Sequence, residues 1–119
     1  MAIQQKIHLH GGHGGPFESV AIYDDAADSQ PGLLLFPNFM GIKQWDHDKA
    51  HVLAQMGYKV LVVDFYGQGK RGTDMESSTA LMHELVTDRA VMRDRLLGAL
   101  TELTGIAGVD QHRLGAIGF

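Results

Sequence analysis

The chain has 119 residues, of which 45% are hydrophobic and 20% are charged, a composition that fits one globular domain and excludes a disordered or fibrous protein. Its formal net charge is -4 and its Lys and Arg residues are scattered, so no basic patch suggests nucleic acid or an anionic membrane as a partner. The chain has no Cys, which excludes disulfides, thiolate metal sites and a Cys nucleophile within these residues.

The N-terminal segment, residues 1–9, alternates apolar and polar side chains and lacks the continuous apolar core of a signal peptide. No stretch approaches the length that spans a bilayer. We therefore expect a cytoplasmic protein, because a reducing compartment is compatible with a chain that has no Cys.

Two short strands are predicted first, at residues 3–8 and 18–23, and the Gly-rich run 11–16 between them favours a β-hairpin. Residues 32–37 then form an apolar run without polar alternation, which is typical of a strand covered on both faces in a parallel sheet. Pro37 ends this strand.

Residues 44–56 have the spacing of an amphipathic helix, and Gly57 follows where a C-cap glycine belongs. The apolar face is predicted from Trp45, Val52, Leu53 and Met56, with His47, His51 and Gln55 on another, exposed face. A second buried strand is expected at residues 59–64. Strand, helix and strand with short joints indicate a right-handed βαβ crossover, and therefore a parallel sheet.

Residues 77–103 are helix-prone, with a break predicted near Thr87 and Asp88 and with Ser77 and Ser78 as N-cap candidates. One apolar stripe is predicted from Met92, Leu96, Ala99, Leu100 and Leu103. Residues 113–119 follow as a further buried strand, rich in small residues. A doubly wound topology places this last strand at an edge of the sheet.

Histidine pairs and groups raise the question of a metal. His8, His10 and His13 lie close to a glycine turn, and His47 and His51 are four residues apart on a helix, but no third ligand joins the helical pair. We predict neither a metal nor a cofactor. Asp64 at a strand end lacks the preceding glycine fingerprint of a dinucleotide fold, so a ribose-binding role is not favoured.

Three blocks of sequence carry a specific resemblance: residues 32–43, 57–66 and 114–119. Their order and spacing resemble the dienelactone hydrolase family of α/β-hydrolases over nearly all of the chain. The resemblance implies one partial α/β domain over residues 1–119, a truncated α/β-hydrolase fold in which an N-terminal hairpin precedes parallel strands with flanking helices. It also implies ester or lactone hydrolysis as the activity of the family.

In that family the segment resembling residues 115–119 runs into the elbow that carries the nucleophile, a Cys or in some relatives a Ser, and the acid and the histidine of the triad follow it. The resemblance therefore implies that no catalytic side chain lies in this chain, which we expect to be inactive alone. It assigns one oxyanion-hole donor to the backbone N–H of Phe39. It places Asn38, Gln68, Lys70 and Arg71 at the active-site rim. Asn38 and Gln68 replace a glutamate and an arginine that family members often have, so the substrate class stays open.

We also expect self-association, because an exposed apolar edge strand is a template for pairing. Two chains would form a homodimer through residues 113–119, either by covering each other's last strand or by exchanging elements. Three alternatives stay open at this point. The chain is an inactive piece of an enzyme family, a non-catalytic self-associating or binding module, or a fragment of a longer active protein.

Overall fold

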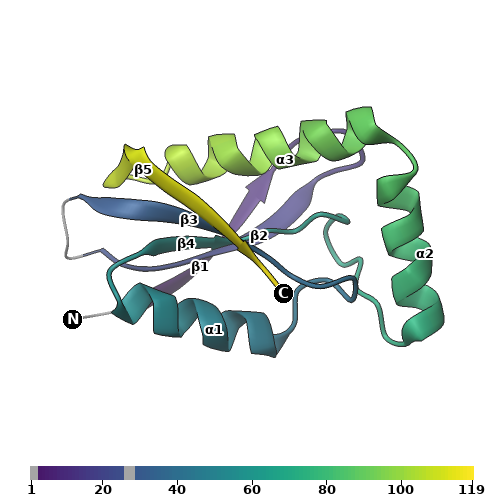
Figure 1. Cartoon of the computed structure of the whole chain (residues 1–119), viewed down its shortest axis with the longest axis horizontal. Helices are drawn as coiled ribbons and strands as arrows, with labels where there is room; N and C mark the ends of the chain where they lie inside the picture. The colour runs from purple at the N-terminus through teal and green to yellow at the C-terminus, as the bar shows by residue number, and fades with distance from the viewer. Residues whose placement is uncertain (1–2, 26–28) are drawn as a thin grey trace.

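A computed structural model of the chain describes residues 3–25 and 29–119, which form a sheet with helices packed on it (Figure 1). The strands are β1 Ile3–His10, β2 Phe17–Asp24, β3 Gln30–Phe36, β4 Lys59–Val62 and β5 Val109–Gly118. The helices are α1 Gln44–Gln55, α2 Met75–Val86 and α3 Arg89–Thr104. No helix in the described part of the chain is long and apolar enough to cross a membrane.

The strands form one mixed sheet in the order β1-β2-β4-β3-β5. The predicted hairpin of β1 and β2 is confirmed, and β2 also pairs antiparallel with β4. The predicted parallel sheet is confirmed as well, because β3 pairs parallel with β4 on one side and with β5 on the other. Leu34 of β3 lies in register with Leu61 of β4 and Ala116 of β5. The fold class is α/β, as predicted.

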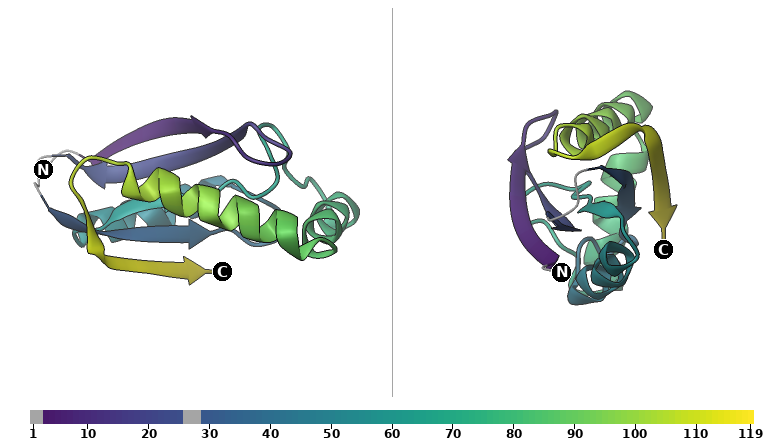
Figure 2. Two further views of the ribbon diagram at one scale, coloured as in Figure 1. Left: turned by 90° about the horizontal axis from the view of Figure 1, so that it is seen from above. Right: turned by 90° about the vertical axis from the view of Figure 1, so that its left-hand side faces the viewer.

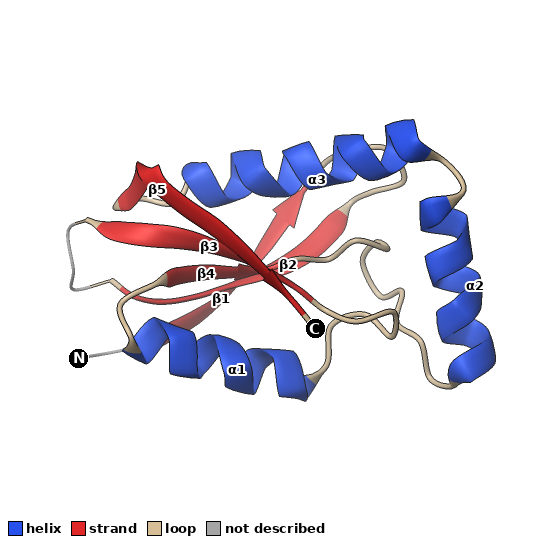
Figure 3. Cartoon of the chain, in the orientation of Figure 1, coloured by secondary structure: helices blue, strands red, loops and turns tan. Residues whose placement is uncertain are grey.

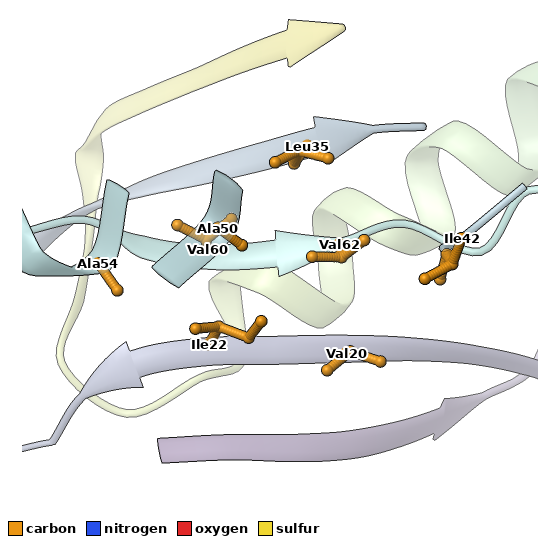
Figure 4. Close-up of a cluster of buried hydrophobic side chains, with 8 residues drawn as sticks. All are labelled: Val20, Ile22, Leu35, Ile42, Ala50, Ala54, Val60 and Val62. Carbon is orange, nitrogen blue, oxygen red and sulfur yellow. The ribbon is translucent and has the colours of Figure 1, made fainter. Parts of the chain in front are cut away.

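Helices α1 and α3 cover opposite faces of the sheet (Figures 1 and 2). Side chains of a strand alternate between faces, so β4 contributes to both cores. On the α1 face the core comprises Val20, Ile22, Leu35, Ile42, Ala50, Ala54, Val60 and Val62 (Figure 4). On the α3 face it comprises Ala21, Tyr23, Leu34, Leu61, Val63, Ala99, Leu103 and Ile106. This two-sided cover explains why β3 and β4 have no polar alternation.

The orientation of α1 differs from the prediction. Trp45, Val52 and Met56 are 60%, 57% and 67% exposed, whereas Ala50 and Ala54 face the sheet. Small alanines allow the helix to approach the strands closely, and His47 and His51 consequently lie half-buried instead of on an exposed face. The end of the helix is as predicted.

Gly57 closes α1 with a φ of 103°. Its N–H donates to Ala54 O at 3.1 Å, and the next N–H, that of Tyr58, donates to Leu53 O at 3.2 Å. This pair of bonds is the Schellman arrangement, in which the residue after the helix needs a left-handed backbone that glycine adopts without strain.

The predicted break between α2 and α3 is confirmed, because Thr87 ends α2 and Asp88 caps α3 through its side chain. The predicted N-caps of α2 are wrong. Asp74 is the N-cap, and its carboxylate accepts from the Ser77 N–H at 2.8 Å while Ser77 Oγ accepts from the Asp74 N–H at 3.2 Å. Ser78 is buried against Gly72 instead of capping the helix.

The apolar stripe of α3 is rotated relative to the prediction. Ala99 and Leu103 are buried as expected, but Leu96 is 40% exposed and Arg95 is buried in its place. The Arg95 guanidinium donates to His13 O at 3.0 Å and to Phe65 O at 2.8 Å. Its hydrogen bonds to carbonyls distant in the sequence make this burial tolerable.

Strand β5 lies at the edge of the sheet, as predicted, and begins four residues earlier than expected. Its predicted burial is wrong: most of its residues are exposed, including Leu114 at 39%. Among the described residues β5 pairs with β3 alone, so one edge and much of both faces stay uncovered. Strands β3 and β4 end one and two residues earlier than predicted, at Phe36 and Val62.

Candidate active site

Two loops meet at the end of the sheet where β3, β4 and β5 terminate. One loop, residues 37–43, leaves β3 and the other, residues 63–74, leaves β4 (Figure 3). The chain passes from β3 to β4 through α1 and then crosses β3 to reach β5 through α2 and α3. The carboxyl end of β3 is therefore the topological switch point, which is where open α/β sheets form their ligand crevices.

Residues 38–41 form a tight turn just after β3. Gly41 N–H donates to Asn38 O at 3.0 Å, and Met40 N–H donates to the Asn38 side-chain Oδ1 at 3.0 Å. Gly41 has a φ of 84°, a left-handed conformation that favours glycine. Asn38, predicted at the rim, is exposed, and its side chain stabilises its own turn.

This turn determines the direction of the Phe39 N–H. The N–H and C=O of one trans peptide point in opposite directions, and the Asn38 C=O is directed to Gly41. No acceptor for the Phe39 N–H is found within residues 3–25 and 29–119. The end of β5 lies close by, since Phe119 N–H donates to Phe36 O at 3.3 Å.

Asp64, two residues after the end of β4, is the hydrogen-bonding centre of the second loop. Its side chain is 1% exposed. It accepts from the N–H groups of Glu18 at 2.8 Å, Tyr66 at 3.1 Å and Gly67 at 3.0 Å. Arg71 Nη1 lies 3.3 Å from the same carboxylate. A buried carboxylate that accepts from this many donors has its hydrogen-bonding capacity satisfied and fixes the path of the loop.

The remaining predicted rim residues differ in exposure and in the hydrogen bonds of their side chains. The side chains of Gln68 and Lys70 are exposed, whereas Arg71 Nη1 also donates to Gly67 O at 3.3 Å and to Lys70 O at 3.0 Å. The charge of Arg71 is thus committed to its own loop and to Asp64. Lys70 is the more exposed of the two cations, and its aliphatic part lies beside Gly67.

Three hydrogen bonds join the two loops. Tyr66 Oη donates to Phe39 O at 2.9 Å, and Gly72 N–H donates to Met40 O at 2.8 Å. Lys43 Nζ donates to Gly72 O at 2.7 Å. Burial raises the pKa of Tyr66, so its hydroxyl stays protonated and available as a donor. The turn at Phe39 is therefore held from the neighbouring loop.

Helix α2 stands beyond this end of the sheet and reaches the second loop through a close contact (Figure 1). A Cβ on Gly72 would lie 1.9 Å from Ser78 Oγ and 2.9 Å from Ser78 Cα. Since such distances are not tolerated, the contact between loop and helix requires a residue without a side chain at position 72.

His47 of α1 is a half-buried titratable group beside Asp46, whose carboxylate accepts from the Lys43 N–H of the first loop at 2.9 Å. Its Nε2 is buried and has no hydrogen-bond partner among the described residues. Burial lowers the pKa of His47, although the neighbouring Asp46 carboxylate acts in the opposite direction. The side chain is therefore neutral at neutral pH, and it donates nothing to the Phe39 turn in the hydrogen bonds described.

The N-terminal histidines do not converge. His8 Nδ1 lies 2.9 Å from Glu102 Oε1, and His10 Nε2 lies 2.8 Å from Ser19 Oγ, so each has its own partner on a different element. Within the described ranges there is no group of three His, Cys, Asp or Glu residues placed to hold a metal ion.

Sequence reasoning missed the residues that support the Phe39 turn. From the sequence alone Asp64 is considered only as a ribose-binding acid, and no pattern marks Tyr66 or Lys43. A polar residue at the end of a buried strand, followed by a Gly-rich loop, was the available signal. Each of these residues also has a partner between 27 and 46 residues away in the chain, which local patterns could not identify.

Similarities to known proteins agree with this geometry. The model of the family described as "Dienelactone hydrolase family" matches residues 17–119. A solved structure named m3DLH is 31% identical in sequence, with a TM-score of 0.93. The alignment covers 100% of this chain and 50% of that protein. A dienelactone hydrolase-like promiscuous phosphotriesterase, P91, from metagenomic libraries is 26% identical with a TM-score of 0.91 and the same two coverages. None of the curated proteins matches the chain.

The chain thus spans about half the length of these solved relatives. The family model covers more than four-fifths of the chain, from the start of β2 to the end of β5. The chain belongs to the dienelactone hydrolase family.

Proposed function

We propose that this chain forms half of the active site of a hydrolase of carboxylic esters or lactones and that residues 1–119 alone do not turn over substrate. The observation that carries the proposal is the turn of residues 38–41 at the switch point of the sheet, with the Phe39 N–H unpaired among the described residues. That N–H is assigned as one oxyanion-hole donor.

The chemistry needs such a donor because attack on an ester carbonyl places negative charge on its oxygen. A fixed N–H aimed at this oxygen stabilises the transition state more than the substrate. In the family the second donor and the nucleophile come from the elbow after the strand that matches β5. The Phe119–Phe36 hydrogen bond supports this arrangement, because it brings the end of β5 beside the Phe39 loop.

The rim of the proposed site comprises Asn38, Gln68 and Lys70, with Arg71 behind it on Asp64. A polar rim with one exposed cation suits a polar or anionic substrate but does not select one substrate. Because one relative is named a phosphotriesterase, phosphotriesters are a second substrate class to assay. We propose the cytoplasm as the site of action, since a chain without Cys suits a reducing compartment.

The test compares the chain alone with the chain fused to the second half of the m3DLH relative, using an activated carboxylic ester and a phosphotriester. We expect no turnover by the chain alone and turnover by the fusion. Turnover by the chain alone would overturn the proposal.

Two substitutions at position 39 isolate the N–H in the fusion. Phe39→Pro removes the donor at the second position of a turn, where proline is favoured, and Phe39→Ala keeps it. We expect kcat for Phe39→Pro to fall roughly 100- to 1000-fold below that of Phe39→Ala. Equal kcat values would reject Phe39 as the donor.

A second role, self-association, is favoured by the exposed side of β5. The outer face of α1, made of Trp45, Val52 and Met56, is largely exposed and lies next to Phe119, which is 47% exposed. Lys49 Nζ lies 4.2 Å from the Trp45 ring centre and 4.4 Å from that of Phe119. A groove between α1 and β5 is lined by Lys49, Val52, Leu53, Ile117 and Phe119.

We propose that a second copy of the chain covers the exposed side of β5, and that the β5 strands of the two copies pair with each other. A two-fold axis brings identical edges together antiparallel and covers both exposed strands at once. Light scattering should give a dimer. Leu114→Lys, on the exposed edge strand, should give a monomer, whereas Thr79→Lys on the exposed surface of α2 adds the same charge and should not. A monodisperse monomer before substitution would reject self-association.

A further inference from the structure

We propose that Tyr66 is a positioning residue that holds the Phe39 N–H in place as an oxyanion donor. This inference rests on the proposed function and adds a residue that contacts no reacting atom. Its basis is the hydrogen bond of 2.9 Å from Tyr66 Oη to Phe39 O, which crosses from one loop to the other.

The turn that presents the Phe39 N–H needs support from outside itself. Asn38 is exposed, and within the turn the N–H groups of Gly41 and Met40 both donate to oxygens of Asn38. A donor contributes fully only when it is held close to its productive geometry, and a surface turn alone rotates its peptides easily.

Tyr66 supplies the support at the peptide that follows Phe39. The C=O of this peptide accepts from Tyr66 Oη, and its N–H, that of Met40, donates to Asn38 Oδ1. Both polar groups of the peptide are thereby fixed. The Phe39 backbone is then restrained on its C-terminal side by Tyr66 and on its N-terminal side by the Asn38–Gly41 bond.

The Tyr66 ring packs directly beside Gly41. A Cβ at position 41 would lie 3.5 Å from Tyr66 Cδ2 and 3.0 Å from Arg71 Cδ. The Tyr66 ring is 7% exposed, so it packs under the turn and does not swing into solvent. The Tyr66 hydroxyl therefore contacts the Phe39 carbonyl from a ring that is fixed by packing.

Tyr66 is in turn connected to the sheet through Asp64. The Tyr66 N–H donates to the buried Asp64 carboxylate, which also accepts from Glu18 at the start of β2. The Asp64 N–H donates to Ser19 Oγ at 3.0 Å. The support thus passes from β2 and the end of β4 through Asp64 and Tyr66 to the turn, a path made of buried, paired groups.

The first experiment uses the 119-residue chain and measures amide hydrogen exchange by NMR. Tyr66→Phe removes only the hydroxyl and retains the ring, so the fold is preserved. Exchange at Met40 and Gly41 should rise about three- to tenfold, the effect of losing one ordinary hydrogen bond. The matched control is Tyr23→Phe, a buried tyrosine of β2, which should leave these two amides unchanged. Unchanged exchange in Tyr66→Phe would overturn the positioning role.

The second experiment places Tyr66→Phe in the fusion with the relative's second half. Since Tyr66 acts through Phe39, kcat should fall about three- to thirtyfold with KM unchanged, less than for Phe39→Pro. Suppose that Phe39→Pro lowers kcat, and that Tyr66→Phe speeds amide exchange but leaves kcat unchanged. That result would overturn the link from Tyr66 to catalysis. If Phe39→Pro has the same kcat as Phe39→Ala, the proposed function fails, whatever the exchange data show for Tyr66.

Discussion

Strands β4 and β5 flank β3 in the same parallel sense, but their surroundings differ. Val60, Leu61 and Val62 of β4 are completely buried, whereas Leu114 of β5 is 39% exposed. Strand β4 has β2 and β3 as neighbours, with α1 and α3 on its two faces. Strand β5 has β3 as its neighbour within the described residues, and the outer face of α1 beside it is open.

The difference shows that an apolar sequence and parallel pairing do not by themselves bury a strand. Burial on both faces comes from the helices, and both α1 and α3 pack over β2, β3 and β4. The small side chains of Gly115, Ala116 and Gly118 also leave β5 little apolar surface to contribute. The predictions below compare the two sides of β3.

The largest expected difference is between two leucine truncations. Leu61→Ala removes a completely buried side chain from β4 and should lower the free energy of unfolding by about 2–5 kcal/mol. Leu114→Ala in β5 should cost less than about 1 kcal/mol, because its side chain is already partly in water. Urea unfolding of both variants measures this. Equal losses would mean that β5 is covered in solution.

The next comparison uses two carboxylates that each accept backbone N–H groups and face an arginine. Asp64→Asn removes the charge of a buried group with three backbone donors and should cost about 1–3 kcal/mol. Asp110, on β5, accepts from the His112 N–H and from Arg113, which lower its pKa, but it is in contact with water. Asp110→Asn should cost much less, and thermal unfolding at pH 7 compares the two. An equal loss would contradict the central role of Asp64.

The smallest effect concerns His47 on the half-buried side of α1. Burial lowers the pKa of His47 below its ordinary value of 6.5, so below that pH the unfolded chain binds more protons than the folded one. Stability should fall as the pH drops below about 6.5 and level off below the folded pKa. His47→Gln should flatten this part of the profile, whereas His83→Gln on the exposed surface of α2 should not. An unchanged slope in His47→Gln would contradict the assignment.

The sequence predicted the order of the elements, because their signals are local. The apolar runs around Leu34 and Leu61, the Gly57 end of α1 and the break at Thr87 and Asp88 all depend on near neighbours. The side of a helix that faces the sheet was harder to predict. In α1 the large apolar Trp45 dominates the predicted apolar face, yet it is exposed. Ala50 and Ala54 face the sheet because their small side chains allow the helix to approach the strands closely.

Contacts that join distant parts of the chain could not be predicted from the sequence. Arg95 interrupts an apolar stripe, and its burial depends on carbonyls of two loops, at His13 and Phe65. At the candidate site, the resemblance led to Phe39, whereas the supporting role of Tyr66 appears only when the loops after β3 and β4 are brought together. Periodicity contains no information about such pairs.

The contact between Gly72 and Ser78 limits how this site can be redesigned. Gln68 and Lys70 are exposed, so a library that randomises them to change substrate preference keeps the scaffold intact. Position 72 has to stay glycine in such a library, because any Cβ there collides with the Ser78 backbone as well as its hydroxyl. Shortening Ser78 alone does not open this position, so variation is confined to the outer part of the loop.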